Sequence, residues 1–147
     1  MKKLMKIKKI DKIDNKISNF IFNLRNKYYV RKNSITKSKI TLKNHKTWVK
    51  NFFKRKNILF IIMKKEILIG YVRLELEKKK YNVSWALTKN YHGKGFAKKS
   101  LRFATKNKLY KYKALINKKN VISLKVASHS KFKSKMTKNN LVYLYKN

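Results

Sequence analysis

Two glycines two positions apart, Gly93 and Gly95, form the part of the sequence best suited to hold an anion. They separate a predicted strand, residues 81–87, from a predicted helix that begins at about Phe96. Small residues at such a junction let backbone N–H groups converge on one anion, and the helix dipole adds about half a positive charge there. Three lysines add mobile positive charge beside it: Lys94, Lys98 and Lys99. The junction predicts a pyrophosphate-binding turn, although glycines that only relieve strain in a turn would give the same local pattern.

The predicted strand 66–77 carries the two carboxylates best placed to take up a proton, Glu75 and Glu77. Strand periodicity places these carboxylates on one face of the sheet together with Tyr71 and Arg73. The opposite face is expected to hold Leu68, Val72, Leu74 and Leu76. Gly70 is expected to mark a bulge or a close approach of another chain segment. Pairing with some of the many lysines is the alternative role of the two carboxylates, because charged strand residues are usually solvated.

The elements that would position these residues follow from the apolar periodicity. Asp11 or Asp14 is expected to cap a helix that ends at about Arg25, and Thr41 a helix that ends at about Lys54. The other expected elements are strands 2–10, 58–63, 66–77, 81–87, 112–116 and 141–145 and helices 96–109 and 120–130. The order β-α-α-β-β-β-α-β-α-β predicts an α/β fold with a mixed sheet, and the length predicts a single domain over residues 1–147.

Charge is the most prominent feature of the composition, since 42 Lys and Arg residues against 5 Asp and Glu give a formal net charge of +37. Such a charge is typical of proteins with nucleic-acid partners. The basic residues are mostly Lys, however, and are spread over the whole chain with abundant Asn and Ile, as codon drift in an A- and T-rich genome would produce. We favour drift over a selected polyanion site, and either cause predicts salt-sensitive, non-specific polyanion binding.

Other function classes have little support in the composition. The chain has no cysteine, and its three histidines are scattered, so neither a cysteine nucleophile nor a metal site is expected. Its longest apolar stretch, residues 58–63, is too short to cross a bilayer, and the lysine-rich start lacks the long apolar segment of a secretory signal. We therefore expect a cytoplasmic protein without a membrane span.

Two motifs resemble those of the GNAT superfamily of N-acetyltransferases. Residues 82–97 resemble its strand and pyrophosphate loop, whose signature is Arg or Gln, two residues, Gly, one residue, and Gly or Ala. Gly95 and Ala97 fit this signature, and His92 stands where Arg or Gln is usual. The second motif resembles the family's Asn-x-x-Ser helix that ends in Gly-Phe, and it comprises Asn120, Ser123, Phe132 and, in place of the glycine, Lys131.

The resemblance implies a GNAT-like mixed sheet with helices on both faces and acetyl-CoA as the co-substrate. The pyrophosphate would lie on the amides of residues 93–97, and a backbone N–H near Ala86 or Leu87 would polarise the thioester carbonyl. The expected cofactor-binding residues are Ala86, Leu87, His92, Gly93, Lys94, Gly95, Phe96, Ala97, Asn120 and Ser123. The acceptor amine would attack the thioester directly, with Glu75 or Glu77 assisting its deprotonation. Two residues frequent in the family are missing, because Asn82 replaces a Glu and Ala127 a Tyr.

The segments between residues 24 and 48 resemble GNAT enzymes that acetylate an amino sugar carried on a nucleotide, as in pseudaminic-acid and related surface-glycan pathways. Arginine is scarce in the chain, and a guanidinium fork suits a nucleotide diphosphate. The expected acceptor-binding residues are Arg25, Arg31, His45 and Arg73. Helix packing is the alternative role of His45 and the better interpretation of Trp48. Alternative functions are acetylation of a protein N-terminus, ribosome-associated nucleic-acid binding, and a structural relative with a blocked cleft.

Overall fold

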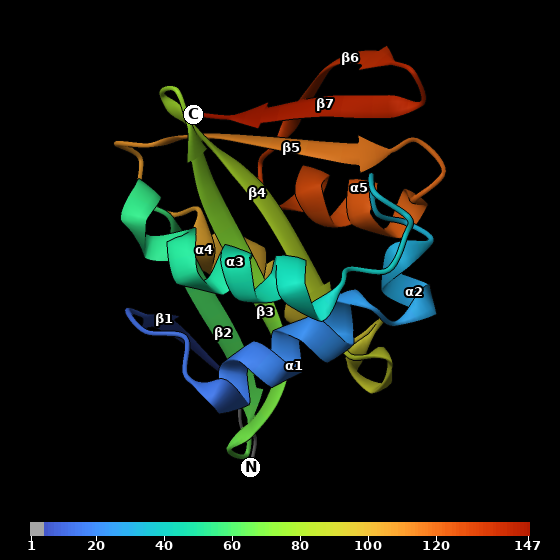
Figure 1. Cartoon of the computed structure of the whole chain (residues 1–147). Helices are drawn as coiled ribbons and strands as arrows, with labels where there is room; N and C mark the ends of the chain where they lie inside the picture. Colours follow the sequence, from blue (N-terminus) through green and yellow to red (C-terminus); the bar gives the residue numbers. More distant parts are fainter. Residues whose placement is uncertain (1–4) are drawn as a thin grey trace.

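The computed structural model describes residues 5–147 (Figure 1). The strands are β1 (Met5–Ile10), β2 (Ile58–Lys64), β3 (Ile67–Glu77), β4 (Lys80–Leu87), β5 (Lys111–Asn117), β6 (Lys133–Lys138) and β7 (Leu141–Lys146). The α-helices are α1 (Asn15–Arg25), α2 (Tyr28–Arg31), α3 (Leu42–Asn51), α4 (Phe96–Ala104) and α5 (Val121–His129), and residues 52–55 and 89–91 form short 3-10 turns. No helix among the described residues is long and apolar enough to cross a membrane.

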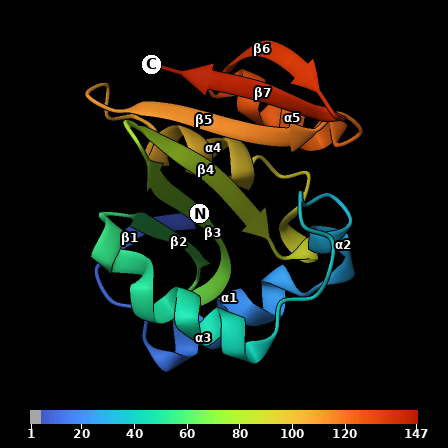
Figure 2. The same ribbon diagram turned by 45° about the horizontal axis from the view of Figure 1, so that its top comes forward.

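The strands form one seven-stranded mixed sheet in the order β1-β2-β3-β4-β5-β7-β6. All neighbours are antiparallel except β4 and β5, which run parallel. These two strands pair only over residues 80–82 and 111–113 and then diverge, as Figure 2 shows. The sheet is therefore continuous at one end of β4 and open at the other.

Helices cover both faces of the sheet, as the sequence predicts. Helices α1 and α3 lie in front of β2, β3 and β4 in Figure 1, and α4 lies behind them. The core on the α1 face contains Ile17, Ile21, Leu24, Phe52, Leu59, Ile61, Tyr71 and Ala86. The larger core on the other face includes Ile62, Ile69, Val72, Leu74, Leu101, Ala104, Tyr112 and Ala127. The expected mixed sheet with helices on both faces is thus confirmed.

A register shift in the β2–β3 hairpin corrects one predicted face. Ile62 pairs with Gly70, but Met63 pairs with Leu68, so Ile69 is the extra residue of a β-bulge. The bulge reverses the alternation, and Leu68 therefore packs on the α1 face while Ile69 joins the opposite core. Gly70 is the expected point of close approach, since a Cβ there would lie 2.5 Å from the carbonyl oxygen of Ala86.

Local capping signals predicted the helix starts correctly. The Asp14 carboxylate accepts a hydrogen bond from the N–H of Ile17 at 2.8 Å, and the Thr41 hydroxyl accepts one from the N–H of Asn44 at 3.1 Å. The expected strand 2–10 is observed from Met5, and residues 2–4 lie outside the described part of the chain.

Three elements differ from prediction. Strand β6 was not predicted, because all six of its residues are exposed and carry no apolar alternation. The short helix α2 lies between the first two predicted helices, where no element was predicted. Helix α4 ends at Ala104 and not at Leu109, which is 90% exposed and contributes nothing to a buried helix face.

Candidate active site

Two adjoining hollows lie where β4 and β5 diverge. The first, which we call the loop hollow, has a volume of about 560 Å³ and is lined by Trp85–Leu87, residues 91–93 and 95–98, and one side of α5, whereas the predicted Lys94 does not line it. The second, the arginine hollow, has a volume of about 320 Å³ and is lined by Arg25, Tyr71, Arg73 and Ser84 together with Leu115 and Ile116 of β5. The residues common to both hollows are Val30, Asn33, Ser34, Trp85, Asn120 and Ser123.

The turn that opens α4 has the geometry of an anion cradle. Gly93 and Gly95 have φ angles of +73° and +82°, which residues with a side chain rarely adopt. A Cβ at either glycine would meet no other atom within 4 Å, so the space in front of the turn is open. Gly95 is the N-cap of α4 and supplies no side-chain acceptor, which leaves the first-turn N–H groups of Phe96, Ala97 and Lys98 directed toward a ligand.

His92 fastens this turn to the end of β4. Its Nε2 lies 2.8 Å from the carbonyl oxygen of Leu87, and because a carbonyl only accepts, Nε2 carries the hydrogen. The ring packs edge-on against Tyr29 at a centroid distance of 5.5 Å, and the Tyr29 hydroxyl accepts a hydrogen bond from the N–H of Lys89. His92 therefore lines the loop hollow while its Nε2–H is committed to the strand end.

The strand register decides which backbone N–H faces the open side of β4. Leu87 pairs with Gly70, and the N–H of Thr88 donates to the carbonyl of Ile69 at 2.8 Å. In an antiparallel ladder this pattern makes Leu87 a non-hydrogen-bonded residue and Ala86 a hydrogen-bonded one. The N–H of Leu87 is therefore directed into the gap between β4 and β5, whereas that of Ala86 is directed toward β3.

Asn120 and Ser123 lie at the N-terminus of α5 and line both hollows. The side-chain oxygen of Asn120 caps the helix by accepting a hydrogen bond from the N–H of Ser123 at 3.2 Å. The capping role explains the Asn-x-x-Ser spacing by local structure. The Asn120 amide nitrogen and the Ser123 hydroxyl are the groups left to contact a ligand.

Two arginines stack around one tryptophan beside the arginine hollow. The guanidinium carbons of Arg25 and Arg73 each lie 5.5 Å from the centroid of Trp48, and that of Arg73 lies 5.8 Å from the ring of Tyr71. Burial, and then the positive charge of Arg73, lower the pKa of Arg25 to about 10. Burial also raises the pKa of the Tyr71 hydroxyl, which outweighs the opposite effect of the two arginines.

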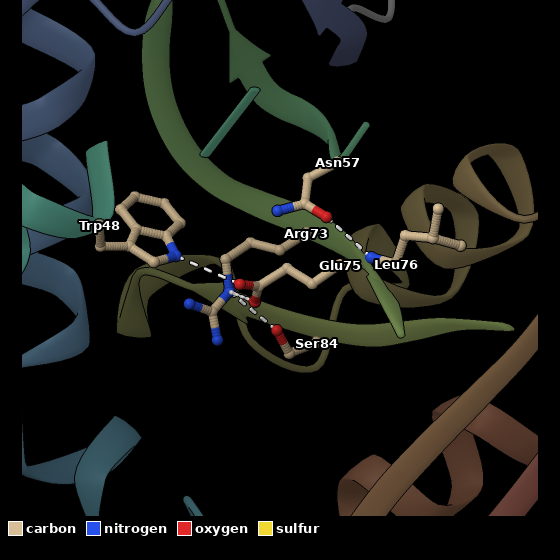
Figure 3. A network of polar contacts seen from close by, with 6 residues as sticks. All are labelled: Trp48, Asn57, Arg73, Glu75, Leu76 and Ser84. Atoms are coloured by element: carbon tan, nitrogen blue, oxygen red, sulfur yellow. Dashed lines mark hydrogen bonds and ion pairs between the residues drawn. The ribbon is translucent and has the colours of Figure 1, made fainter. Parts of the chain in front are cut away.

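Glu75 contacts both Trp48 and Arg73 through its carboxylate (Figure 3). Its Oε2 accepts a hydrogen bond from Nε1 of Trp48 at 3.3 Å, and its Oε1 lies 3.7 Å from Nε of Arg73. The same Nε donates to the Ser84 hydroxyl at 2.9 Å. The figure shows both terminal nitrogens of Arg73 pointing away from Glu75 and Ser84.

The two predicted catalytic carboxylates lie outside the hollows. Neither Glu75 nor Glu77 is among the lining residues, and Glu75 reaches the arginine hollow only through its contact with Arg73. The exposed Glu77 pairs with Lys80 at the far end of the β3–β4 hairpin, where it accepts a hydrogen bond from the half-buried Asn82 side chain at 3.2 Å. Their predicted role in proton transfer stays untested.

Two of the four predicted acceptor-binding residues have structural partners instead. Arg31 donates to the backbone carbonyls of Asn26 and Lys37 at 3.1 and 3.0 Å and thereby holds the loop after α1. His45 is 1% exposed, and its Nε2 lies 3.0 Å from both the hydroxyl and the carbonyl of Ser18. Arg25 and Arg73 are the predicted residues that do line the hollow.

Several lining residues were not singled out from the sequence. Trp85 lines both hollows, and Tyr71 lines the arginine hollow together with Arg73. Asn33 and Ser34, in the loop after α2, also line both hollows. For Tyr71, strand alternation was a usable signal, because it places Tyr71 on the same face of the sheet as the predicted site residue Arg73. The loop carries no periodic pattern, so the signal for Asn33 and Ser34 was the resemblance of the segments between residues 24 and 48 to amino-sugar acetyltransferases, which did not single out these two side chains.

The fold and the cradle at the end of β4 define the class to which this protein belongs. Residues 14–133 match the family model described as an acetyltransferase (GNAT) domain. The chain is therefore a member of the GNAT acetyltransferases, and it is an enzyme of that family. No curated protein matches the sequence significantly.

Solved structures share the fold at low sequence identity. A domain from Methanocaldococcus jannaschii is 20% identical with a TM-score of 0.82, and the match covers 97% of this chain and 99% of that one. Spermidine N-acetyltransferase from Vibrio cholerae, solved with CoA and spermine, is 14% identical with a TM-score of 0.78 over 97% and 94%. The Campylobacter jejuni N-acetyltransferase PseH, solved with acetyl coenzyme A, is 18% identical with a TM-score of 0.70 over 98% and 99%.

Proposed function

We propose that this GNAT acetyltransferase transfers an acetyl group from acetyl-CoA to the primary amine of a nucleotide-linked amino sugar in surface-glycan biosynthesis. One observation carries the acceptor part of the proposal: Arg25 and Arg73 line a hollow that has no Asp or Glu among its described lining residues. A hollow with this charge favours an acceptor that carries an anionic group.

The loop hollow fits acetyl-CoA. The positive-φ glycines leave the cradle open, and the first-turn amides of α4 and the nearby lysines match a pyrophosphate. Structures of GNAT neighbours that hold CoA or acetyl-CoA support this assignment. Asn120 and Ser123 would contact the bound co-substrate from α5, and Ala86 and Leu87 from the end of β4. When bound, acetyl-CoA supplies an activated acetyl thioester.

The chain's contribution to the reaction is positioning and charge stabilisation. In the transfer, the amine nitrogen forms a bond to the acetyl carbon, the carbon–sulfur bond breaks, and the thiolate takes up a proton. Leu87 N–H, which is directed into the gap, would donate to the carbonyl oxygen on which negative charge develops. The amine must also lose a proton, and that Glu75 or Glu77 assists this step stays a prediction. A shifted lower limb in the pH–rate profile of Glu75→Gln or Glu77→Gln would identify the base.

The charge of the arginine hollow argues against a polyamine acceptor. A polyamine such as the spermine bound in the Vibrio cholerae structure is cationic, and the ion pairs it needs require carboxylates. The described lining residues of both hollows include arginines, lysines and histidines but no carboxylate. Acetylation of a protein N-terminus remains the second candidate, since it needs no anion at the arginine hollow. A cytoplasmic location and a single domain over residues 1–147 stay predictions from the sequence.

The acceptor is tested by comparing initial rates of transfer to four compounds at moderate salt. These are a UDP-linked 4-amino sugar, the same sugar without the nucleotide, an N-terminal peptide and spermidine. The chain has no cysteine, so released CoA can be followed with a thiol reagent without a protein background. We expect the highest kcat/KM with the nucleotide-linked sugar. Faster transfer to the peptide or to spermidine, or indifference to the nucleotide, would contradict the proposal.

A further inference from the structure

The two arginines of the arginine hollow are bonded unequally. Nε of Arg73 donates to Ser84 at 2.9 Å and lies 3.7 Å from the Glu75 carboxylate. The guanidinium of Arg25, in contrast, donates no hydrogen bond to any group within residues 5–147, and its carbon lies over the ring of Trp48, 5.5 Å from the centroid. A half-buried guanidinium with five N–H donors and no protein acceptor is poised for a ligand.

The local charges are also unbalanced. Within residues 5–147, Glu75 is the single carboxylate in contact with this group, whereas Arg25 and Arg73 bring two positive charges. Burial is the main cause of the lowered pKa of Arg25, and the positive charge of Arg73 lowers it further. An anion bound at Arg25 would balance the second charge and remove the repulsion between the two guanidinium groups.

We propose that Arg25, stacked on Trp48, is the receptor for an oxyanion carried by the acceptor, and that Glu75 is a positioning residue that holds Trp48 and Arg73 behind it. This inference rests on the proposed function, because it takes the arginine hollow as the acceptor site. It names which arginine binds the anion and separates Glu75 from the proton-transfer role predicted from the sequence.

The positioning role of Glu75 follows from its contacts with Trp48 and Arg73. One carboxylate oxygen of Glu75 orients the indole of Trp48, and the other faces Nε of Arg73, so the indole plane and the Arg73 side chain are fixed relative to each other (Figure 3). The fixed indole is the surface on which Arg25 lies. A guanidinium held over the ring in this way can offer its planar fork to a carboxylate or a phosphate, which accept it in the same bidentate geometry.

The binding test uses the indole N–H signals of the full chain in a ¹H–¹⁵N spectrum. The chain has two tryptophans, and Trp48→Phe assigns the two signals. The probes are UDP, glucuronate and uridine, which offer a diphosphate, a carboxylate and no anion. We expect UDP or glucuronate, but not uridine, to shift the Trp48 signal with saturation. Absence of any anion-dependent shift of Trp48 would overturn the proposal.

Substitutions locate the receptor. We expect Arg25→Gln to weaken binding of the active anion by about tenfold or more, the loss for a charge-assisted bidentate contact. Arg25→Lys keeps the charge but not the fork and should bind more weakly than the wild type. Arg55→Gln removes the same charge from an exposed position on the 3-10 turn after α3 and should leave binding unchanged. Equal loss in Arg25→Gln and Arg55→Gln would show generic charge and overturn the assignment.

The role of Glu75 is tested with two substitutions. A positioning residue needs a hydrogen-bond acceptor, so Glu75→Gln should retain more activity than Glu75→Ala, with the loss in the acceptor KM. A base needs a carboxylate, so both variants would then lose kcat alike, and Gln would shift the pH–rate profile. That second outcome would overturn the positioning role. Anion binding at Arg25 with glucuronate but not UDP would support the receptor and refute the nucleotide part of the proposed function.

Discussion

Asn82 and Lys113 are the last paired residues of the parallel strands β4 and β5, and both hollows open beyond this pair. Antiparallel pairing with β3 continues along β4 as far as Leu87. The last residues of β4 are therefore paired with β3 along one edge and are not paired with β5 along the other. This arrangement places the N–H of Leu87 in the gap, on the side of the loop hollow that holds the α4 cradle.

Replacing Gly95 by Val is expected to abolish binding of acetyl-CoA. Its φ of +82° is strained for a β-branched residue, and the added side chain would occupy the open space of the cradle. Calorimetric titration at moderate salt measures the loss. Asn139→Val is the control, because Asn139 also has a positive φ, +53°, but lies in the β6–β7 turn. Unchanged binding in the Gly95 variant would remove the basis for the cradle.

Replacing Gly70 by Ala is expected to destabilise the protein by about 1–3 kcal/mol, the usual cost of overpacking a buried site. The new Cβ would lie 2.5 Å from the Ala86 carbonyl oxygen and 2.6 Å from Cδ2 of Leu87, so the end of β4 must move. We expect kcat/KM to fall as well, because Leu87 lines the loop hollow. Urea unfolding measures the loss of stability, and steady-state rates measure the change in kcat/KM. Wild-type stability in the variant would show that the end of β4 can move without a cost in free energy.

The His92 side chain is expected to be replaceable by Gln but not by Ala. An amide can donate to the Leu87 carbonyl, which now receives the Nε2–H of His92 at 2.8 Å, and a methyl group cannot. Loss of this hydrogen bond is expected to cost about 0.5–1.5 kcal/mol and to weaken CoA binding accordingly. Titration of both variants with CoA decides the point, and equal affinities would show that the turn keeps its shape without the contact.

The stability of the protein is expected to fall as the pH falls below about 6.5, the pKa of histidine in an unfolded chain. Burial lowers the pKa of His45, Arg25 lowers it further, and the contact with Ser18 opposes both effects only in part. As the pH falls, His45 is protonated in the unfolded chain before it is protonated in the folded protein. The free energy of unfolding therefore decreases as the pH falls. The buried Nδ1 of His45, which has no hydrogen-bond partner in the part of the chain that the structure describes, is consistent with a neutral ring.

Urea unfolding at about pH 7.5 and about pH 5.5, on either side of that value, measures this effect. His45→Gln should show a smaller loss of stability between the two pH values than the wild type. His129→Gln removes an exposed histidine and should leave the pH dependence as it is. A His45 variant that loses as much stability as the wild type would assign the acid sensitivity to other groups.

The sequence by itself determined the features that depend on neighbouring residues. The N-caps at Asp14 and Thr41, the alternation of β4 and the glycine turn before α4 each involve groups two or three positions apart, so residue type and spacing suffice. The two motifs at residues 82–97 and 120–132 lie in such elements. They indicated the acetyltransferase family that the family model confirms.

The tertiary structure decided what depends on distant segments. Arg25 and Arg73 meet over Trp48 because α1, β3 and α3 pack together, whereas Arg31 and His45 are drawn into backbone and helix contacts by the same packing. The direction of the Leu87 N–H follows from its pairing with Gly70, since a shift of one residue would reverse it. Strand β6 exists because β7 offers it a free edge, and its exposed residues carry no pattern of their own.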